Sequence, residues 1–384
     1  MNGISTIRHY LTNLGVLLFP LILPMPLPLK TKSIALILFL ITLLGFIDIS
    51  KLKWRNILAN KTILLFALLF LIEPITSFLR EEQFSYSEVK LSFIIAPLLF
   101  YLSQSKIKRH KNSIFYVFII GVFVYLAFAL IYLIYFYSTS KYEVFGLDYY
   151  LKYVLYHHLP FAIHHTYLGV YICFANTLIL FSKRPTNQIK ILLSIPLFFS
   201  IFIIGSKFSI VIYCFLLLIY MFWVLRSRIK VLIFTIVIFS ITILSSVYVL
   251  MVRTDLFRTL EDSIFIRYRV FQCSLKGISD NVLLGVGRKG IKEFIENCVD
   301  NAQIRMDTHN VLLQEFLANG VFGIFLLILL IVHLFKSAKI IEFKVFLVIF
   351  FSAGMLEHIL TLQHGVTFFV FFSLLFNFTS NDVK

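Results

Sequence analysis

The chain has 384 residues, of which 60% are hydrophobic and only 14% charged, and its formal net charge is +16. Soluble globular chains carry about 25% charged residues, so these values exclude a soluble enzyme, a nucleic-acid-binding domain and a disordered chain. They are typical of an integral membrane protein, in which surplus Lys and Arg usually set the orientation of the spans.

Apolar runs of about 20 residues, each long enough to cross about 30 Å of hydrocarbon, fill most of the chain. They predict an all-α polytopic bundle of about twelve transmembrane helices. The expected spans are 9–28, 33–49, 62–79, 89–104, 113–138, 160–181, 190–205, 207–225, 230–251, 309–335, 341–357 and 364–379. Four prolines interrupt the first run, so its outer end is not expected to be regular helix. It has no convincing cleavage site and is interpreted as an uncleaved span.

The loop charges predict the orientation. With a cytoplasmic N-terminus, the inner connections and the two ends of the chain hold 19 cationic residues, whereas the short outer loops and span ends hold seven. The positive-inside rule therefore predicts that both termini are cytoplasmic, which in a bacterium means the inner membrane with the outer loops at its periplasmic face.

One outer segment is long. Residues 1–251 form spans one to nine, 252–308 form a periplasmic loop with short amphipathic helices, and 309–384 form spans ten to twelve and a cytoplasmic C-terminus. An amphipathic helix is predicted at 263–279, lying near the membrane surface. Its apolar side carries Phe265, Tyr268, Phe271 and Leu275.

The loop also holds two cysteines, Cys273 and Cys298. A disulfide between them is expected if the loop faces an oxidising compartment, and two free thiols are the alternative.

The stretch from Asp307 to Glu315 offers the best candidate for acid–base chemistry. Asp307 or Thr308 could cap the helix of span ten and place His309 in its first turn. A histidine at that position tends to stay neutral and able to accept a proton. The alternative is that His309 only lies at the water interface.

Several outer cations could bind phosphate. Arg267 and Arg269 offer planar forks that suit phosphate oxygens, although they could instead pair with Glu261 and Asp262 or contact lipid headgroups. Lys207 lies where span seven turns into span eight. A cation at such a turn is often functional, but it could also reach water.

Residues 285–290 fit G-x-G-x-x-G and contain Arg288. A dinucleotide-binding turn requires a βαβ unit, which a loop between membrane helices does not provide. The turn could still hold a phosphate on backbone N–H groups and on Arg288. A flexible loop with solvated charges is the alternative.

The remaining histidines give weaker signals. His157, His158, His164 and His165 are close in sequence, but no carboxylate or cysteine completes a metal-ligand set, so neither a metal nor a cofactor is predicted. A second group lies between spans eleven and twelve, where its members could border the same cavity or simply be hydrated: Glu357, His358, Gln363 and His364.

In this order, the motifs resemble the O-antigen ligase and polymerase family, whose members are bacterial inner-membrane proteins that act on lipid-linked glycans at the periplasmic face. The resemblance covers roughly residues 160–375. It rests on His165-Thr166-Tyr167, Gly205-Ser206-Lys207, Arg267 with Phe271, Leu284-Gly285-Val286-Gly287, His309-Asn310 with Leu313-Gln314, Gly320 with Gly323, Glu357, and Gln363-His364-Gly365.

The resemblance implies metal-independent transfer of a glycan from undecaprenyl diphosphate to an acceptor hydroxyl. By motif, His309 takes the catalytic role and Arg267 one diphosphate-binding role. Lys207 stands where the family has a second arginine, and it keeps the charge but loses the bidentate fork. Arg269 and Arg288 are further candidates for the diphosphate. The candidates for the acceptor site are Asn310, Gln314, His165 and Tyr167.

The expected partners are the lipid-linked donor, a glycan acceptor and membrane lipids, without nucleic acid. A ligase would use a sugar of the lipid A core as acceptor, and it is favoured because the long loop lies late, just before His309. A polymerase, which joins lipid-linked repeat units, is the nearest alternative. A flippase would carry charges inside its spans, where Glu73 is a rare candidate.

Overall fold

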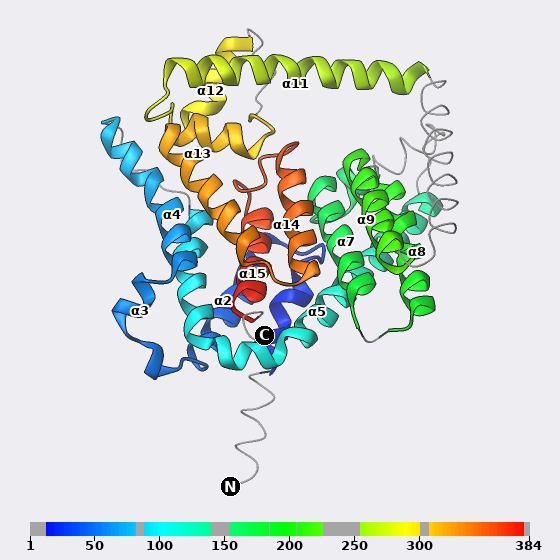
Figure 1. Cartoon of the computed structure of the whole chain (residues 1–384). Coiled ribbons are helices and arrows are strands. Elements are labelled where there is room, and N and C mark those ends of the chain that lie inside the picture. Colours follow the sequence, from blue (N-terminus) through cyan, green and yellow to red (C-terminus); the bar gives the residue numbers. More distant parts are fainter. Residues whose placement is uncertain are drawn as a thin grey trace.

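The computed structural model describes residues 13–81, 88–139, 154–183, 185–204, 206–225, 254–299 and 307–379. Within these ranges the regular elements are all helices, as predicted (Figure 1). Three helices are long and apolar enough to cross a membrane: Lys61–Leu79, Glu88–Thr139 and Val311–Ser337. Shorter apolar helices cover Asn13–Ile22, His165–Phe181, Asn187–Ile201 and Phe208–Phe222. The count of twelve spans stays a prediction, and the ninth, 230–251, lies outside the described residues.

The bundle is built from α2 (Leu29–Leu44), α4 (Lys61–Leu79), α5 (Ser92–Thr139), α7 (His165–Phe181), α8 (Asn187–Ile204), α9 (Lys207–Leu225), α13 (Val311–Ser337), α14 (Ile341–Gly354) and α15 (Gln363–Thr379), with the short α3 (Trp54–Leu58) between α2 and α4. In α15 every residue from Gly365 to Thr379 is buried. A helix that is apolar on all sides is stable only inside other helices. Its phenylalanine rings meet those of α2, α5, α7 and α14, so α15 forms the centre of the core.

The expected spans four and five lie on one continuous helix, without the predicted break between them. Expected as two helices, 89–104 and 113–138, they form the single helix α5, whose middle part lies at the lower end of the bundle in Figure 1. The connecting stretch contains no Gly or Pro, so nothing stops the helix. Lys106 and Lys111 rest on the rings of Phe46 and Phe115, which lets these charged residues stay on the helix.

The proline-rich end of the first run behaves as expected. The helix from residue 13 ends at Ile22, and turns follow at 23–26. Prolines at 24, 26 and 28 lack the N–H that would continue the helix. Leu29 then begins α2 directly after Pro28.

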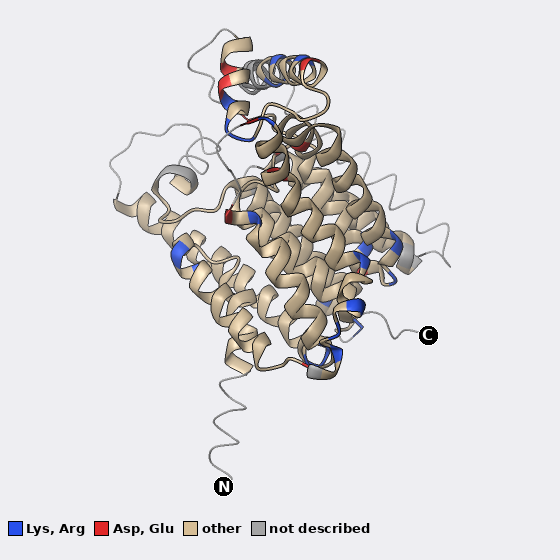
Figure 2. Cartoon of the chain, turned by 90° about the vertical axis from the view of Figure 1, so that its left-hand side faces the viewer, with Lys and Arg blue, Asp and Glu red and all other residues tan. Residues whose placement is uncertain are grey.

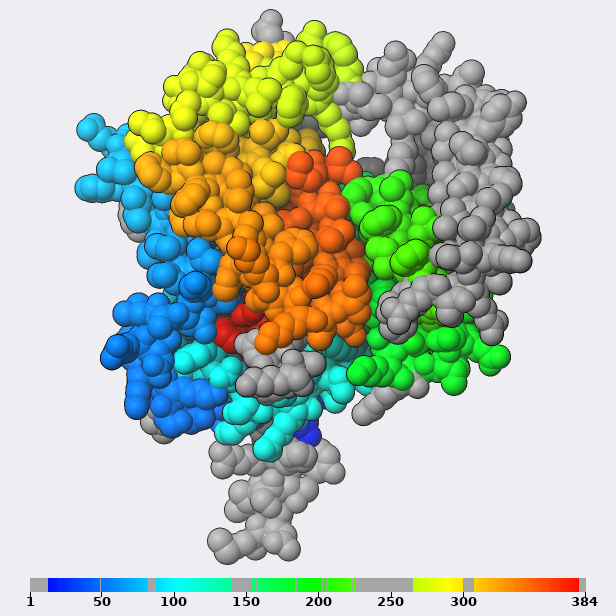
Figure 3. All heavy atoms as spheres, in the orientation of Figure 1, coloured from blue at the N-terminus to red at the C-terminus, as the bar shows by residue number. Residues whose placement is uncertain are grey.

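The outer segment forms two helices that lie across one end of the bundle, α11 (Thr254–Asp280) and α12 (Gly290–Val299). Figure 3 shows them as yellow-green and yellow spheres above α13. Val270, Cys273 and Gly277 of α11 are buried toward α12 and α13, whereas the predicted apolar side faces outward: Phe265, Tyr268, Phe271 and Leu275 are exposed. The helix predicted at 263–279 is confirmed.

The expected disulfide is present. Cys273 on α11 and Cys298 on α12 are bonded, with their Cα atoms 5.9 Å apart. The bond ties α11, which carries two candidate arginines, to the helix beside it. Figure 2 shows that charged residues gather at the two ends of the bundle, as the hydrocarbon interior of a membrane requires.

Candidate functional site

His309 lies in a short loop before α13, and the local structure differs from the prediction. Asn310, not Asp307 or Thr308, caps the helix, because its side-chain oxygen accepts hydrogen bonds from the N–H groups of Leu312 and Leu313. His309 therefore precedes the cap and does not lie in the first turn. Its φ of +50° is uncommon for a residue with a side chain, and such strain is often found at functional sites.

Two of the residues predicted for the acceptor site, Asn310 and Gln314, form hydrogen bonds around this loop. Asn310 also donates from Nδ2 to the carbonyl of Met355 at 3.2 Å. Gln314 is buried and accepts from the Thr308 hydroxyl at 2.8 Å. The side-chain oxygen of Gln314 and both polar side-chain atoms of Asn310 are therefore engaged within the protein.

Glu357 is the direct partner of His309. Its Oε2 lies 3.1 Å from Nδ1 of His309, and its side chain is only 9% exposed. Burial by itself would raise the pKa of Glu357, but the hydrogen bond to His309 and the nearby imidazoles outweigh burial and hold the pKa below its usual value. An ionised carboxylate can only accept, so Nδ1 of His309 donates to it. The neutral imidazole then has its lone pair on Nε2.

Three further charged or titratable side chains lie around this pair. The Arg267 guanidinium is 3.8 Å from Glu357 and remains 44% exposed. His358 lies between two carboxylates, with Nε2 3.2 Å from Asp307 and Nδ1 4.0 Å from Glu357. Burial is the main cause that lowers the pKa of His358. We call Arg267, Asp307, His309, Glu357 and His358 the outer group.

Part of the outer group could hold a metal ion. Among the described residues, one ligand atom from each of His309, Glu357 and His358 lies within 4.8 Å of the others. Two imidazoles and a carboxylate suit Zn²⁺. Asp307 would then orient His358 through Nε2, as second carboxylates do in zinc sites. This arrangement involves none of the adjacent histidines considered from sequence.

A second set of charges lies inside the protein. Lys90, fully buried, donates to Glu315 at 2.5 Å and lies 3.9 Å from Glu73. Arg288 reaches the same two acids, at 3.2 Å from Glu73 and 3.3 Å from Glu315. We call Glu73, Lys90, Arg288 and Glu315 the interior group. Two acids and two cations make it neutral in sum, so Glu73 is paired here, and Arg288 faces carboxylates instead of an open phosphate site.

The glycines beside Arg288 have a packing role. Gly285 has φ +68°, and a Cβ atom there would lie 2.5 Å from the carbonyl oxygen of Leu317. Gly320, at a kink inside α13, has φ +65°, and its Cβ would lie 2.0 Å from the carbonyl of Leu283. Only glycine combines these backbone angles with so close an approach. The G-x-G-x-x-G pattern thus joins the outer loop to the kinked helix.

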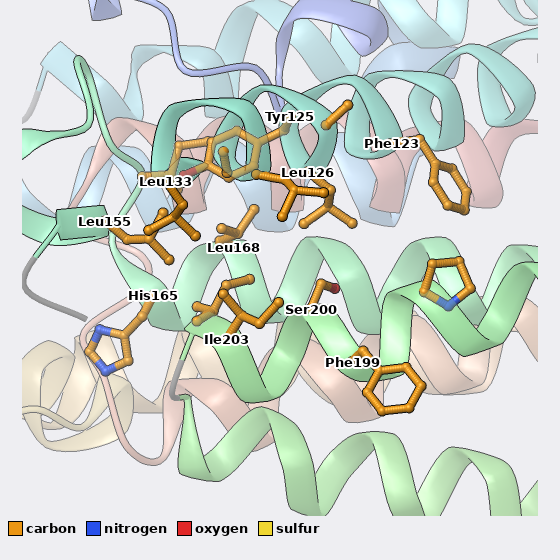
Figure 4. Close-up of a pocket in the computed structure, with 16 residues that line it drawn as sticks. Phe123, Tyr125, Leu126, Leu133, Leu155, His165, Leu168, Phe199, Ser200 and Ile203 are labelled. Atoms are coloured by element: carbon orange, nitrogen blue, oxygen red, sulfur yellow. The ribbon is translucent and has the colours of Figure 1, made fainter. Parts of the chain in front are cut away.

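His165 and Tyr167 lie at the start of α7. His165 lines a cavity of about 350 Å³ between α5, α7 and α8, whose other walls are almost all apolar (Figure 4). Its ring lies 4.2 Å from that of His164, which in turn is 6.1 Å from Tyr167. Tyr167 is buried and lies 6.4 Å from the ring of His364.

The other two cations predicted to bind the diphosphate are Lys207 and Arg269. Lys207 begins α9, but its side chain lies outside the described residues. Arg269 is exposed, and its guanidinium lies over the ring of Phe265 at 4.8 Å. Residues two apart on a helix point to different sides, so Arg267 and Arg269 cannot both face Glu357.

Sequence reasoning gave no chemical role to Glu357, His358 and Asp307. Glu357 and His358 are adjacent at the outer end of an expected span. Such a pair is as typical of a hydrated loop as of a functional site. Only the fold brings the connection between α14 and α15 against the loop before α13.

Comparison with known proteins gives a family match for part of the chain. A model described as O-antigen ligase matches residues 192–328, which include Arg267, Arg288 and His309. The match covers little more than a third of the chain, and this region is similar to the O-antigen ligase family. A search of curated proteins found no match. The match and the long apolar helices support a membrane enzyme of the O-antigen ligase and polymerase type. His165, Tyr167 and Glu357 lie outside the matched range.

Proposed function

We propose that this protein transfers a glycan from undecaprenyl diphosphate to a hydroxyl of the lipid A core at the periplasmic face of the inner membrane. The observation that carries the proposal is the hydrogen-bonded pair of His309 and Glu357 beside Arg267, within a chain that matches the O-antigen ligase family in part. The twelve-span topology with both termini in the cytoplasm is part of the proposal, and the charge distribution of the loops supports it.

In the proposed reaction, the acceptor hydroxyl attacks the anomeric carbon while the bond from that carbon to the diphosphate oxygen breaks. Nε2 of His309 takes the hydroxyl proton, and Glu357 holds the ring and stabilises the imidazolium that forms. Arg267 stabilises the negative charge that develops on the leaving diphosphate. Since Arg267 is half exposed, it can turn from Glu357 toward an arriving phosphate. Lys207 is proposed as a second diphosphate contact.

We also propose that the reaction needs no metal, because fixed cations can stabilise the leaving group. Glycan transfer after addition of a chelator tests this point. Unchanged transfer is expected, whereas loss that Zn²⁺ or Mg²⁺ restores would contradict it. Added Zn²⁺ alone should inhibit glycan transfer. Zn²⁺ bound by His309, Glu357 and His358 would prevent His309 from accepting the hydroxyl proton.

The central test is His309→Ala in a strain that lacks the wild-type protein, with glycan lipids examined by gel. Loss of a general base is expected to reduce transfer by about 10²–10⁴-fold. The matched control is His110→Ala, whose ring stacks on Phe46 in a different part of the bundle. Retention of full activity in the His309 variant would overturn the assignment.

The same gel separates the two activities of the family. A ligase defect leaves core lipid without polymer while undecaprenyl-linked chains accumulate. Loss of long chains from both pools would instead identify a polymerase. A flippase is disfavoured because Glu73, the acid that could have faced a central cavity, is paired with Arg288 and Lys90.

A further inference from the structure

Lys32, near the start of α2, is a buried cation with an unusual environment. It is 3% exposed, and its Nζ has no hydrogen-bond partner among the described residues. None of the carboxylates in the described part of the chain forms an ion pair with it. An uncompensated ammonium in such surroundings is costly, so a partner other than these described residues is expected.

Two helix N-termini meet beside Lys32. The side chain of Gln363 at the start of α15 donates to Ser33 at 2.6 Å, and the rings of Phe39 and Phe371 lie 5.1 Å apart further along. These two pairs show that α2 and α15 run in the same direction with their first turns side by side. The positive ends of both helix dipoles therefore add to the charge of Lys32.

The described groups next to Lys32 supply no counterion for this positive charge. The N-cap of α2 is Pro28, which makes no side-chain capping hydrogen bond. His364, in the first turn of α15, lies within electrostatic range of Lys32 and adds no negative charge. A helix N-terminus together with an unpaired cation is the usual protein environment for a phosphate or carboxylate group.

The position of Lys32 relates it to the outer group. The His364 ring is 6.4 Å from that of Tyr167, and Tyr167 lies within electrostatic range of Glu357 and Asp307. Tyr167 thus lies near both His364, the neighbour of Lys32, and the acids of the outer group. Of the cations predicted for the diphosphate, Arg288 is paired inside the protein and Arg269 lies over Phe265.

We propose that Lys32, with the first turns of α2 and α15, forms an anion-binding site for a phosphate group of the lipid-linked substrate. The proposal rests on the proposed function for the identity of the substrate, but the anion site itself follows from the buried charge. It assigns a binding role to a residue near the N-terminus, far in sequence from the motifs of the family match.

The test compares Lys32→Met with Lys30→Met in the purified full-length protein. Lys30 is exposed in the same helical turn and serves as the matched control. Thermal unfolding is followed without additives and with undecaprenyl diphosphate, inorganic diphosphate or phosphatidylglycerol. Without additives, Lys32→Met should unfold several degrees higher than wild type, because an unpaired buried charge is removed. Its affinity for undecaprenyl diphosphate should fall about tenfold or more, as for loss of a charged hydrogen bond.

Other outcomes have defined meanings. A lower unfolding temperature together with unchanged affinity for all three probes would overturn the proposal and make Lys32 a structural residue. Lys32-dependent binding of phosphatidylglycerol that equals that of undecaprenyl diphosphate would assign the site to a lipid headgroup and overturn the substrate role. If Lys32→Met binds undecaprenyl diphosphate as the wild type does and His309→Ala is inactive, only the proposed anion site is refuted. An active His309→Ala with Lys32-dependent binding would refute only the proposed function.

Discussion

The interior group and the outer group are built from similar side chains in different surroundings. In the interior group, Glu315 is 1% exposed and receives hydrogen bonds from Lys90, Arg288 and Asn319. In the outer group, Arg267 is 44% exposed, and its contact with Glu357 is a looser 3.8 Å. The interior charges form ion pairs with one another inside the protein. In the outer group, a charged side chain such as Arg267 can leave its partner and bind a substrate. The comparison shows that accessibility and titratable histidines, not the number of charges, distinguish a candidate site for chemistry.

The largest effect is expected from Glu315→Gln. The change leaves Lys90 and Arg288 with one carboxylate, and an uncompensated buried charge costs about 3–5 kcal/mol of stability. Chemical denaturation of the purified protein measures this loss, and Glu293→Gln on the exposed side of α12 is the control. Stability equal to that of the control would mean that the interior group is not structural.

The second-largest effect is expected from removal of the disulfide next to the outer group. The bond between Cys273 and Cys298 fixes α11, which carries Arg267, against α12. Cys273→Ser with Cys298→Ser should lower the free energy of unfolding by about 2–4 kcal/mol. Cys214→Ser is the control, since that cysteine is free. If reducing agent leaves the stability of the wild type unchanged, the bond does not support this region.

A smaller effect, and one on activity instead of stability, is expected from Glu357→Gln. The amide keeps the shape of the side chain but no longer stabilises the imidazolium of His309, so transfer should fall about 10–100-fold, which corresponds to about 1.4–2.7 kcal/mol. The unfolding temperature should fall less than in Glu315→Gln, because Arg267 and His309, the partners of Glu357, remain partly exposed to water. Steady-state transfer assays measure this, and a fall in stability as large as that of Glu315→Gln would erase the distinction between the two groups.

The smallest effect is a pH dependence from the outer group. The folded pKa of His358 is lowered, so the unfolded chain binds a proton more readily, and stability falls as the pH drops below about 6.5. The pKa of Glu357 is also lowered, and its contribution is lost only as the pH falls below about 4.3. Unfolding temperatures between pH 7 and pH 5 should decline less in His358→Gln than in wild type. Identical slopes would contradict the role of His358.

Much of the fold follows from patterns along the chain. Apolar length predicted helices, and the prolines predicted that the outer end of the first run is not regular helix; the helix ends at Ile22. Amphipathic spacing predicted a helix at 263–279 with Phe265 and Leu275 on its apolar side, and both are exposed on α11. These features are local, because hydrophobic periodicity and backbone chemistry act within a few turns. The joining of two expected spans into α5 was missed, since charged residues alone do not end a helix.

The candidate site depended on sequence and tertiary structure to different degrees. The sequence by itself identified His309 and Arg267, because their motif and residue types indicate the chemistry. Only the tertiary structure placed Glu357 beside His309 and paired Arg288 with Glu73 and Glu315. It also left Lys32 buried, with no hydrogen-bond partner for its Nζ in the described part of the chain. These contacts join residues far apart in the chain. Burial and pairing, which determine what a charge can do, are properties of the packed helices and not of any segment.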